Sequence, residues 1–570
     1  MTKKDVIRLL EEIATYMELK GENAFKVSAY RKAVQSLEAD ERTMDQIDDV
    51  TELKNIGKGV GEVINTFLET GDSPTLNALK KEVPSGLIPL LKIKGLGSKR
   101  IARLYQELNI TDKDSFQKAA ENHEISALDG FGKKTEEKYL EAIRELGAKK
   151  DAYPIDTMKG LNTLITKHLQ SIEAIERFEV AGSFRRKKEM SKDLDYIIST
   201  NDPLEVQQQL LAIPEKVEEV AVGKTKVSLE LAFDDETIGV DFRLIEPAAF
   251  YHTLQHFTGS KEHNIRIRQI AKQTNEKVSE YGIEQPDGSL LQFDSEAAIY
   301  EHFGVKWMAP SMREDGTEFD KDLSEIVTLD DINGDIHMHT TASDGAFSLR
   351  EMVEANIEKG YQFMCITDHS QSLRVANGLS VDRLLKQNEE IKKLNQAYPE
   401  IDIYSGTEMD ILPDGRLDYD DEVLAQLDYV IAAIHQSFNQ SSEEEIMKRL
   451  EAACRNPYVR HIAHPTGRII GRRDGYAPNM TKLIELCRET GTMLEINANP
   501  KRLDLSAEVL RQNPGLKVTI NTDAHHVDHL NFMNYGIATA QKGFVKKEDV
   551  VNAMSRQAFK QFITQPKSVE

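Results

Sequence analysis

The chain reads Gly182-Ser-Phe-Arg-Arg-Lys-Lys-Glu-Met-Ser-Lys-Asp-Leu-Asp195 between two short apolar runs. The apolar runs predict two strands, and the glycine and basic residues between them predict a turn and a short helix. Because side chains alternate along a strand, we expect Asp193 and Asp195 to project from the same face. Two adjacent carboxylates repel each other, and a hard divalent cation is the usual reason to hold them together. The pair alone is a weak signal, because D-x-D triplets are common in a chain with 29% charged residues.

The turn before these carboxylates offers groups that bind a phosphate. Gly182 and Ser183 supply backbone amides and a hydroxyl, and Arg185 and Arg186 supply positive charge. The whole stretch therefore has the outline of a phosphoryl-transfer site.

The length and composition indicate an ordinary soluble protein of several domains. The 570 residues exceed what one core usually contains and predict about three to five domains. No apolar run reaches the ~18 residues of a membrane span, and residues 1–20 read as an amphipathic helix without a signal-peptide core. The three cysteines lack C-x-x-C spacing, which favours a reducing cytoplasm. The net charge of −23 does not exclude nucleic acid as a partner, because binding depends on local basic patches.

Residues 1–150 are predicted to be wholly helical and contain three copies of one pattern. Each copy places an apolar residue between turn-forming residues, and a new amphipathic helix follows. The copies span residues 53–61, 93–102 and 128–134, and their glycines include Gly57, Gly95, Gly97, Gly130 and Gly132. Glycine frees backbone amides to approach a ligand, and a helix N-terminus favours an anion such as a DNA phosphate. One copy would also fit a plain helical connector, but three copies, each followed by lysine, favour helix-hairpin-helix elements that hold a sugar-phosphate chain without reading its bases.

A third carboxylate follows in residues 152–246, where the pattern changes to mixed helix and strand. Asp241 lies within the apolar stretch Thr237–Ile245, which is predicted to be a strand. An unpaired carboxylate is costly to bury, and a cation shared with Asp193 and Asp195 would remove that cost. Three carboxylates on neighbouring strands match a two-metal site for phosphoryl transfer. Alternatively, Asp241 is an exposed residue of an edge strand.

Four motifs resemble, in this order, those of family X DNA polymerases of the DNA polymerase beta kind. They are G-S-F-R-R from Gly182, D-L-D from Asp193, V-D-F-R from Val240, and F-T-G-S-x-x-x-N-x-x-x-R from Phe257. The resemblance covers residues 1–315 and implies that Asp193, Asp195 and Asp241 are catalytic and hold Mg²⁺. It also implies nucleotide-binding residues for the triphosphate, the sugar, the base and the templating side. These are Ser183, Arg186 and Ser191, then His256, Phe257 and Gly259, then Asn264, and finally Arg268.

Two positions depart from this family. His256 stands where relatives commonly have tyrosine, which bears on the strength of sugar discrimination. Val63 stands where DNA polymerase beta has the lysine of its Schiff-base lyase reaction, and valine cannot form an imine. We therefore do not expect this lyase activity from the aligned position. Phe257 would pack against a deoxyribose, and its alternative role is that of a core aromatic residue beside a turn.

Residues 334–570 alternate short apolar runs with helical stretches, after an acidic segment 316–333 that reads as a linker. His, Asp or Glu stands at the carboxyl end of each of six predicted strands, where parallel α/β folds place their chemistry. One such histidine is more often structural than a ligand. Imidazoles and carboxylates that converge from several strand ends favour a transition-metal site.

These strand ends carry H-x-H, S-D-G, T-D-H, G-x-E, H-P and D-A-H, and they resemble the PHP (polymerase and histidinol phosphatase) domain. The resemblance implies a phosphoesterase with a cluster of Mn or Zn. Its implied metal ligands are His337, His339, Asp344, His369, Glu408, His435, His464, Asp523 and His525. His461, His526 and His529 receive no role.

The sequence thus predicts a multidomain fold, with an all-α helix-hairpin-helix region, an α+β nucleotidyltransferase palm and thumb, and a C-terminal α/β distorted (βα)7-type PHP barrel. We expect six segments along the chain. They are an N-terminal helical DNA-binding domain (1–75), a fingers-type helical domain (76–150), the palm (151–245), the thumb (246–315), the acidic linker (316–333) and the PHP domain (334–570).

Together the resemblances imply a DNA-directed DNA polymerase for gap filling in DNA repair, joined to a metal-dependent 3′-5′ exonuclease; abasic-site cleavage is a further activity that they leave open. The implied partners are gapped or primed DNA and deoxynucleoside triphosphates, without a membrane, for a cytoplasmic monomer. One alternative is a nucleotidyltransferase fused to a small-molecule phosphatase of the histidinol-phosphate type. Another is a DNA-binding scaffold with a non-catalytic PHP domain. The helix-hairpin-helix copies count against the first, and the complete ligand set counts against the second.

Overall fold

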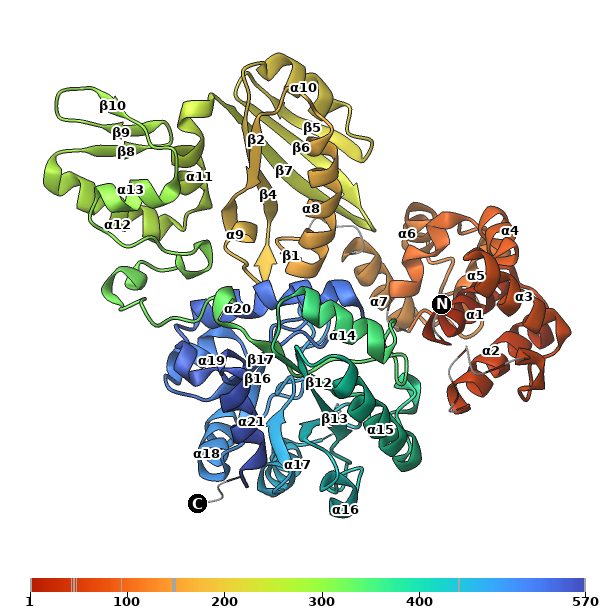
Figure 1. Cartoon of the computed structure of the whole chain (residues 1–570). Helices are drawn as coiled ribbons and strands as arrows, with labels where there is room; N and C mark the ends of the chain where they lie inside the picture. Colours follow the sequence, from red (N-terminus) through yellow and green to blue (C-terminus); the bar gives the residue numbers. More distant parts are fainter. Residues whose placement is uncertain are drawn as a thin grey trace. The chain divides into compact units, whose positions relative to one another are not determined.

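The computed structural model describes residues 3–567 apart from 41, 43, 45, 46, 48, 94, 146–149, 439 and 440. The chain forms two compact units (Figure 1). The N-terminal unit comprises Met1–Lys149 with the loops Thr340–Ser348 and Gln371–Leu379, and the C-terminal unit comprises the remaining residues. Within the described ranges, none of the helices combines the length and the apolar character that crossing a bilayer requires.

The N-terminal unit is built from helices, as predicted. They are α1 (Lys3–Lys20), α2 (Ala24–Ala39), α3 (Lys58–Thr70), α4 (Pro74–Glu82), α5 (Ser98–Leu108), α6 (Lys113–Glu121) and α7 (Lys133–Glu145). Each predicted glycine turn directly precedes a helix. Gly57 is the N-cap of α3, Gly97 is the N-cap of α5, and the carbonyl of Gly132 accepts bonds from the first turn of α7. One apolar core joins α1 to α4, and a second joins α5 to α7.

The palm begins the C-terminal unit. Its elements are β1 (Tyr153–Pro154), α8 (Ile155–Gln170), β2 (Arg177–Val180), α9 (Gly182–Arg185), β3 (Met190–Ser191), β4 (Asp193–Ser199), α10 (Pro203–Leu211), β5 (Lys216–Val222), β6 (Lys226–Phe233) and β7 (Glu236–Ile245). Five strands form a sheet in the order β2-β4-β7-β6-β5. The apolar side of α8 packs on this sheet, so that Met158 and Leu161 share a core with Leu194 of β4. The short α9 follows β2, as the strand-turn-helix-strand prediction requires.

The thumb follows the palm and consists of three helices and a small sheet. They are α11 (Phe250–Thr258), α12 (Lys261–Ala271), β8 (Lys277–Ser279), β9 (Gly282–Glu284), β10 (Leu290–Leu291) and α13 (Glu296–His302). The three strands are antiparallel, in the order β10-β9-β8.

Residues 316–333, which were predicted to form a linker, contact the domains on both sides. The carboxylate of Glu318 is fully buried and lies 2.7 Å from Nδ1 of His263. The amide of Val327 donates to the carbonyl of Val545 over 3.0 Å. This segment is therefore fastened to the thumb on one side and to the C-terminal domain on the other.

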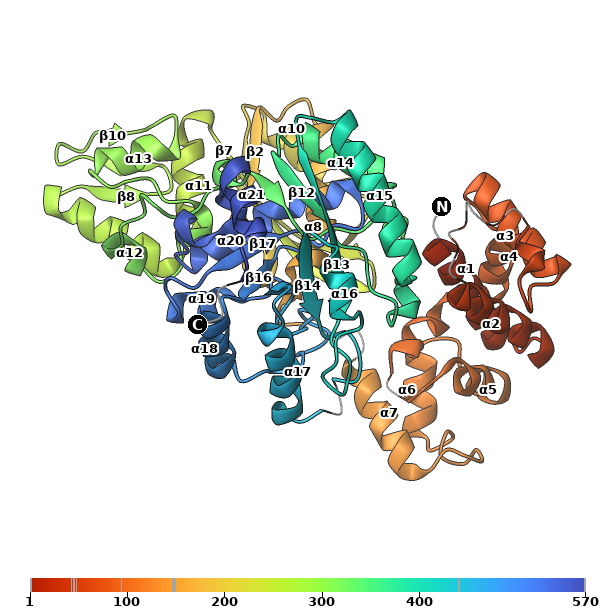
Figure 2. The same ribbon diagram turned by 60° about the horizontal axis from the view of Figure 1, so that its bottom comes forward.

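The C-terminal domain is a nearly closed parallel barrel, which confirms the predicted fold (Figure 2). Its strands are β11 (Gly334–Asp335), β12 (Phe363–Ile366), β13 (Asp402–Asp410), β14 (Tyr429–Ala433), β15 (Val459–Ile462), β16 (Met493–Asn497) and β17 (Val518–Asn521), hydrogen-bonded in this order. A parallel bridge between Met338 and Ala524 brings the residues after β11 beside those after β17. All seven strands run parallel, so their carboxyl ends lie at one end of the barrel.

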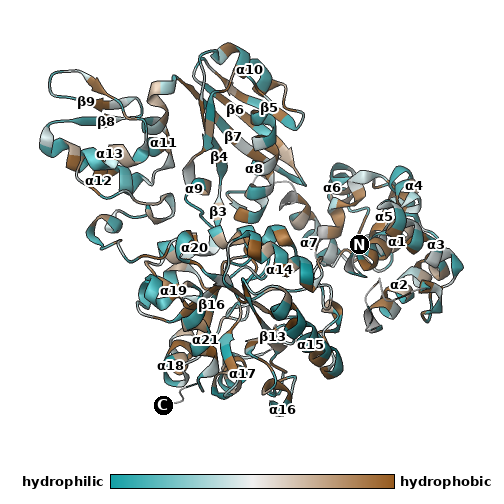
Figure 3. Cartoon of the chain, in the orientation of Figure 1, coloured by the Kyte–Doolittle hydropathy of each residue, from teal (hydrophilic) through white to brown (hydrophobic). Residues whose placement is uncertain are grey.

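Helices surround this barrel. They are α14 (Leu349–Glu358), α15 (Val381–Ala397), α16 (Asp421–Leu424), α17 (Glu443–Arg455), α18 (Met480–Thr490), α19 (Ala507–Gln512), α20 (Met533–Lys542) and α21 (Arg556–Thr564). Figure 3 shows hydrophobic and hydrophilic residues mixed along α14, α15 and α17, as expected for helices with one buried side. The barrel domain also packs on the palm, because Ala498, Leu503 and Tyr535 belong to the palm core.

Candidate active sites

The three predicted palm carboxylates lie on two neighbouring strands. β4 and β7 are parallel partners, and their register pairs Asp195 with Asp241. Asp193 precedes Asp195 by two residues and therefore projects from the same face of the sheet. Burial raises the pKa of Asp195 to about 6, and repulsion from Asp193 and Asp241 adds to this increase. The structure thus gathers the three carboxylates into one electrostatically linked group.

The turn before α9 approaches this group closely. Gly182 has a φ of +63°, and a Cβ added there would come within 3.0 Å of the Asp195 carboxylate. The amide of Ala181 donates to the carbonyl of Asp195 over 2.7 Å. Ser183 and Ser191, both predicted to bind a triphosphate, are joined by a 2.9 Å hydrogen bond between their hydroxyls. Glycine is therefore required at the point where the predicted phosphate-binding turn meets the strand that carries Asp195.

Two cations of the palm for which the sequence predicted no role lie beside the carboxylates. Nζ of Lys226, on β6, is 2.7 Å from Oδ2 of Asp241. Arg243 follows Asp241 by two residues on β7, and its guanidinium lies 3.7 Å from the centre of the Phe257 ring. Sequence spacing could not reveal Lys226, because its approach to Asp241 depends on the pairing of β6 with β7.

Arg185 and Arg186 are adjacent in sequence but have different surroundings. Arg185 forms two hydrogen bonds to the carboxylate of Glu296, of 3.0 and 2.6 Å, and a third to the hydroxyl of Thr258. It therefore fastens the palm to the thumb. Arg186 is buried, donates to the carbonyl of Thr258 and lies close enough to Asp195 to feel its charge. Of these two arginines, Arg186 is the one that lies near the carboxylate group.

The predicted sugar and base contacts lie at the junction of α11 and α12. Nδ2 of Asn264 donates to the carbonyl of His256 over 2.7 Å, and Nε of Arg268 donates to the carbonyl of Asn264 over 3.1 Å. The rings of His256 and Phe257 are 4.9 Å apart. Gly259 is the C-cap of α11, and a Cβ there would come 3.2 Å from Nη1 of Arg186. The predicted nucleotide-selection turn thus adjoins the predicted triphosphate residue.

A cavity of about 900 Å³ lies between the palm and the thumb. Its lining includes Arg243, Phe257 and Tyr281, with Lys224 and Gln292. Arg243 projects from the same face of β7 as Asp241, so the cavity reaches a residue that neighbours the carboxylate group.

The glycine turns of the N-terminal unit present open backbone. A Cβ at Gly57, Gly97 or Gly132 would meet nothing within 4 Å. The N-caps Gly57 and Gly97 supply no side-chain hydrogen bond to their helices, so the first amides of α3 and α5 remain available to an anion. Gly95 and Gly130 have φ values of +87° and +82°, which glycine adopts without strain.

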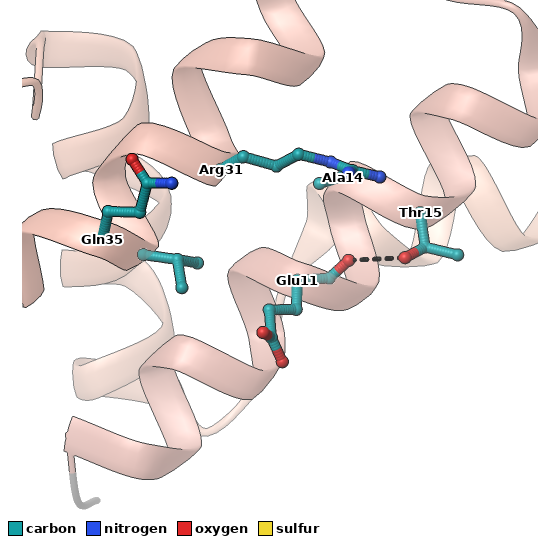
Figure 4. Close-up of a pocket in the computed structure, with 6 residues that line it drawn as sticks. Glu11, Ala14, Thr15, Arg31 and Gln35 are labelled. Atoms are coloured by element: carbon teal, nitrogen blue, oxygen red, sulfur yellow. Dashed lines mark hydrogen bonds between the residues drawn. The ribbon is translucent and has the colours of Figure 1, made fainter. Parts of the chain in front are cut away.

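Val63 packs against the apolar core of the N-terminal unit. A separate pocket of about 450 Å³ lies between α1 and α2 (Figure 4). It is lined by Glu11, Ala14, Thr15, Arg31, Val34 and Gln35.

The C-terminal barrel gathers five histidines around one buried carboxylate at the carboxyl ends of its strands. The distances from the carboxylate oxygens of Glu408 are 3.3 Å to His337, 3.4 Å to His339, 3.1 Å to His369, 3.2 Å to His435 and 2.8 Å to His464. Burial alone would raise the pKa of Glu408, but the histidines, led by His435, hold it well below its usual range. The convergence predicted from the six strand ends is therefore present in the structure.

Asp523 and His525 complete this part of the cluster. Oδ1 of Asp523 lies 3.2 Å from Nε2 of His339, and the rings of His339 and His525 stack with centres 4.2 Å apart. Asp344 lies on the loop Thr340–Ser348, which belongs to the other compact unit. Eight of the nine predicted ligands therefore meet within the C-terminal unit.

Two further carboxylates, which the sequence did not predict, each contact Nδ1 of a predicted ligand histidine. Oε1 of Glu495, on β16, lies 2.7 Å from Nδ1 of His337, and Oδ1 of Asp410 lies 3.0 Å from Nδ1 of His435. Such contacts orient an imidazole and leave its other nitrogen for a metal. His461, which the sequence left without a role, lies 3.8 Å from Glu495. Glu495 is a carboxylate within the apolar strand Met493–Asn497. The same pattern pointed to Asp241 and could have identified Glu495.

The donor set of the barrel fits a bound metal. Nε2 of His337, Nε2 of His339 and Oε2 of Glu408 are buried and have no hydrogen-bond partner among the residues that the structure describes. Buried polar atoms without partners are costly, and a cation shared between them would remove the cost. Imidazole with carboxylate suits first-row transition metals.

Comparisons with known proteins agree with this architecture. Three family models match: a helix-hairpin-helix domain at residues 1–73, the DNA polymerase beta thumb at 253–314, and the PHP domain at 335–499. The chain is 52% identical over 568 residues to the DNA polymerase/3′-5′ exonuclease PolX of Bacillus subtilis (strain 168), and this match covers 99% of each chain. The chain belongs to the PolX family. In this PolX chain the palm carboxylates and the barrel cluster lie on two different sheets of the C-terminal unit.

The barrel of this PolX chain also has relatives of another kind. A probable phosphatase of Caldanaerobacter subterraneus subsp. tengcongensis is 30% identical over 204 residues, which is 34% of this chain and 75% of the relative. A probable phosphatase of Thermoanaerobacter sp. (strain X514) is 29% identical over 204 residues, which is 34% of this chain and 78% of the relative.

Proposed function

We propose that this PolX chain fills short gaps in DNA with its palm site and trims 3′ ends with its barrel cluster. The observation that carries the proposal is the presence of two separate sets of acidic and imidazole groups on two different sheets. The palm set contains carboxylates alone with nearby cations, which suits Mg²⁺ and a triphosphate. The barrel set is rich in histidine, which suits Mn or Zn.

At the palm, Asp193, Asp195 and Asp241 would hold Mg²⁺. The bound ions would activate a primer 3′-hydroxyl and stabilise a leaving pyrophosphate. Ser183, Ser191 and Arg186 bind the phosphates, and Arg186 stabilises the charge that develops on them. His256, Phe257 and Gly259 line the sugar, whereas Asn264 faces the base and Arg268 the templating side. The glycine turns of the N-terminal unit hold the DNA backbone without reading its sequence.

At the barrel, the eight predicted ligands that meet within the C-terminal unit would hold the metal cluster. The bound metals would supply a nucleophile from water and polarise the scissile phosphate. Glu495 and Asp410 keep His337 and His435 oriented, so that their other nitrogens face the cluster. Cleavage beside abasic sites would use the same groups. We place this activity in a cytoplasmic, monomeric protein, consistent with three buried cysteines that are all free.

The division of labour is tested with the full chain on a gapped duplex in Mg²⁺ or Mn²⁺. Asp193→Ala with Asp195→Ala should abolish primer extension and preserve degradation, whereas His339→Ala should do the reverse. Matched controls are Asp287→Ala in an exposed thumb turn and His526→Ala outside the cluster, and both should retain both activities. Loss of both activities in both folded site variants would refute the proposal.

A second candidate for the barrel is hydrolysis of small phosphate monoesters, because the matched phosphatases cover this domain. Single-stranded DNA and a panel of phosphate monoesters, assayed with the same preparation, decide between the two. We expect degradation of DNA to exceed hydrolysis of every monoester, because the helix-hairpin-helix region brings DNA to the enzyme. Faster turnover of a free monoester, also abolished by His339→Ala, would favour the phosphatase.

A further inference from the structure

Three cations surround a single carboxylate beside the predicted triphosphate site. We call these four residues the Glu314 cluster. The carboxylate of Glu314 lies 3.8 Å from Nε of Arg186, 3.4 Å from Nζ of Lys188 and 3.2 Å from Nζ of Lys542. Lys542 is the last residue of α20 and belongs to the barrel domain, whereas Arg186 and Lys188 belong to the palm.

Three of the four side chains are largely buried, and the three cations share the carboxylate of Glu314. The exposed fractions of the side chains are 10% for Arg186, 12% for Lys542 and 18% for Glu314, while Lys188 is 44% exposed. Nε of Arg186 and Oε1 of Glu314 have no hydrogen-bond partner among the described residues. Burial lowers the pKa of Lys542, and Glu314 opposes this effect. Asp195 and Glu262 also offset the charge of Arg186, but Lys188 and Lys542 both pair with Glu314, so these two lysines can receive an additional anion.

The surroundings of the cluster indicate which anion this is. Arg186 interacts electrostatically with Asp195 on one side and approaches Glu314 on the other. The carbonyl of Glu314 accepts a 2.6 Å hydrogen bond from Ser260, next to Gly259 of the nucleotide-selection turn. Arg186 thus links the cluster to the palm carboxylates, and Ser260 links it to the predicted nucleotide-selection turn.

We propose that the Glu314 cluster binds the terminal phosphates of the incoming deoxynucleoside triphosphate, with Lys542 of the barrel domain as a phosphate ligand of the polymerase site. Glu314 holds the three cations together while no nucleotide is bound, and the triphosphate displaces it. The barrel domain thus completes the palm site in addition to carrying its own. This inference rests on the proposed function of the palm.

The test uses the full chain on gapped DNA with a dideoxy-terminated primer, so that dATP binds without reacting. Lys542→Met should raise the Kd for dATP by about tenfold, which is typical for loss of one charge-assisted hydrogen bond. In extension assays the KM for dATP and the inhibition constant of pyrophosphate should rise in parallel, with kcat little changed. Lys542→Arg should restore most of the affinity. Glu314→Gln should lower the Kd for dATP, because a competing carboxylate is removed.

The matched control is Lys546→Met, which removes an exposed lysine from the same domain. It should leave the Kd for dATP unchanged. The Kd for gapped DNA and the exonuclease rate should be the same in all variants, which separates phosphate binding from a general loss of structure. An unchanged Kd for dATP in Lys542→Met, or an equal increase in Lys546→Met, would overturn the inference. If extension instead survives Asp193→Ala with Asp195→Ala, the proposed function of the palm itself fails.

Discussion

Replacing Gly182 by alanine should lower the rate of primer extension more than adding a methyl group at any other position of the palm turn. The φ of +63° costs an L-residue about 1–2 kcal/mol. The new Cβ would come within 3.0 Å of the Asp195 carboxylate, which must therefore move. A shift of about 1 Å in a catalytic group costs about 100-fold in rate. We thus expect extension to fall by about two orders of magnitude, while the free energy of unfolding falls by only about 1–2 kcal/mol.

Primer extension on a gapped duplex measures the rate, and thermal or urea unfolding measures the stability. The control is Gly223→Ala, where a Cβ would meet an ordinary contact of 3.5 Å, and it should extend primers at the normal rate. Exonuclease activity should be retained in both variants. A Gly182→Ala protein that extends primers within about threefold of the unmodified rate would refute the argument that this turn and Asp195 are tightly fitted.

Three further predictions concern the charged groups of the two sites. Burial, Asp193 and Asp241 raise the pKa of Asp195 to about 6. Below that pH most of this carboxyl group is therefore protonated. The Mg²⁺ concentration that supports half-maximal extension should then rise by about tenfold per pH unit below 6 and level off above 7. Without metal, the same carboxyl favours the folded state as pH falls through 6, since its unfolded value is 3.8; a constant Mg²⁺ requirement from pH 5 to 8 would contradict this. Lys226→Met removes a partly exposed cation and should tighten Mn²⁺ binding at the palm by about two- to fivefold in calorimetry without DNA; weaker binding would contradict the assigned repulsion. Glu495→Gln should weaken metal binding at the barrel by about 10- to 100-fold, measured by metal retention on dialysis, and leave extension intact; full retention would show that His337 needs no support.

The palm and barrel sites also differ in how they keep their charges buried. In the palm, Lys226 lies 2.7 Å from Asp241, so a protein cation partly balances the carboxylates. In the barrel, histidines surround Glu408, and Nε2 of His337 and Nε2 of His339 have no hydrogen-bond partner within the described ranges. The barrel site therefore depends on its metal for charge and hydrogen-bond balance more than the palm site does.

The residues that we propose to act in this protein could be named largely from local patterns in the sequence. The alternation of Asp193 and Asp195, the glycine turns and the polar strand ends of the barrel each depend on neighbours within a few residues, and backbone geometry makes such spacing predictable. Only the tertiary structure decided that Lys226 lies beside Asp241, that Arg185 pairs with Glu296 of the thumb, and that Lys542 meets Glu314. Those contacts join segments far apart in the chain, and they follow from strand register and domain packing, which no local spacing specifies.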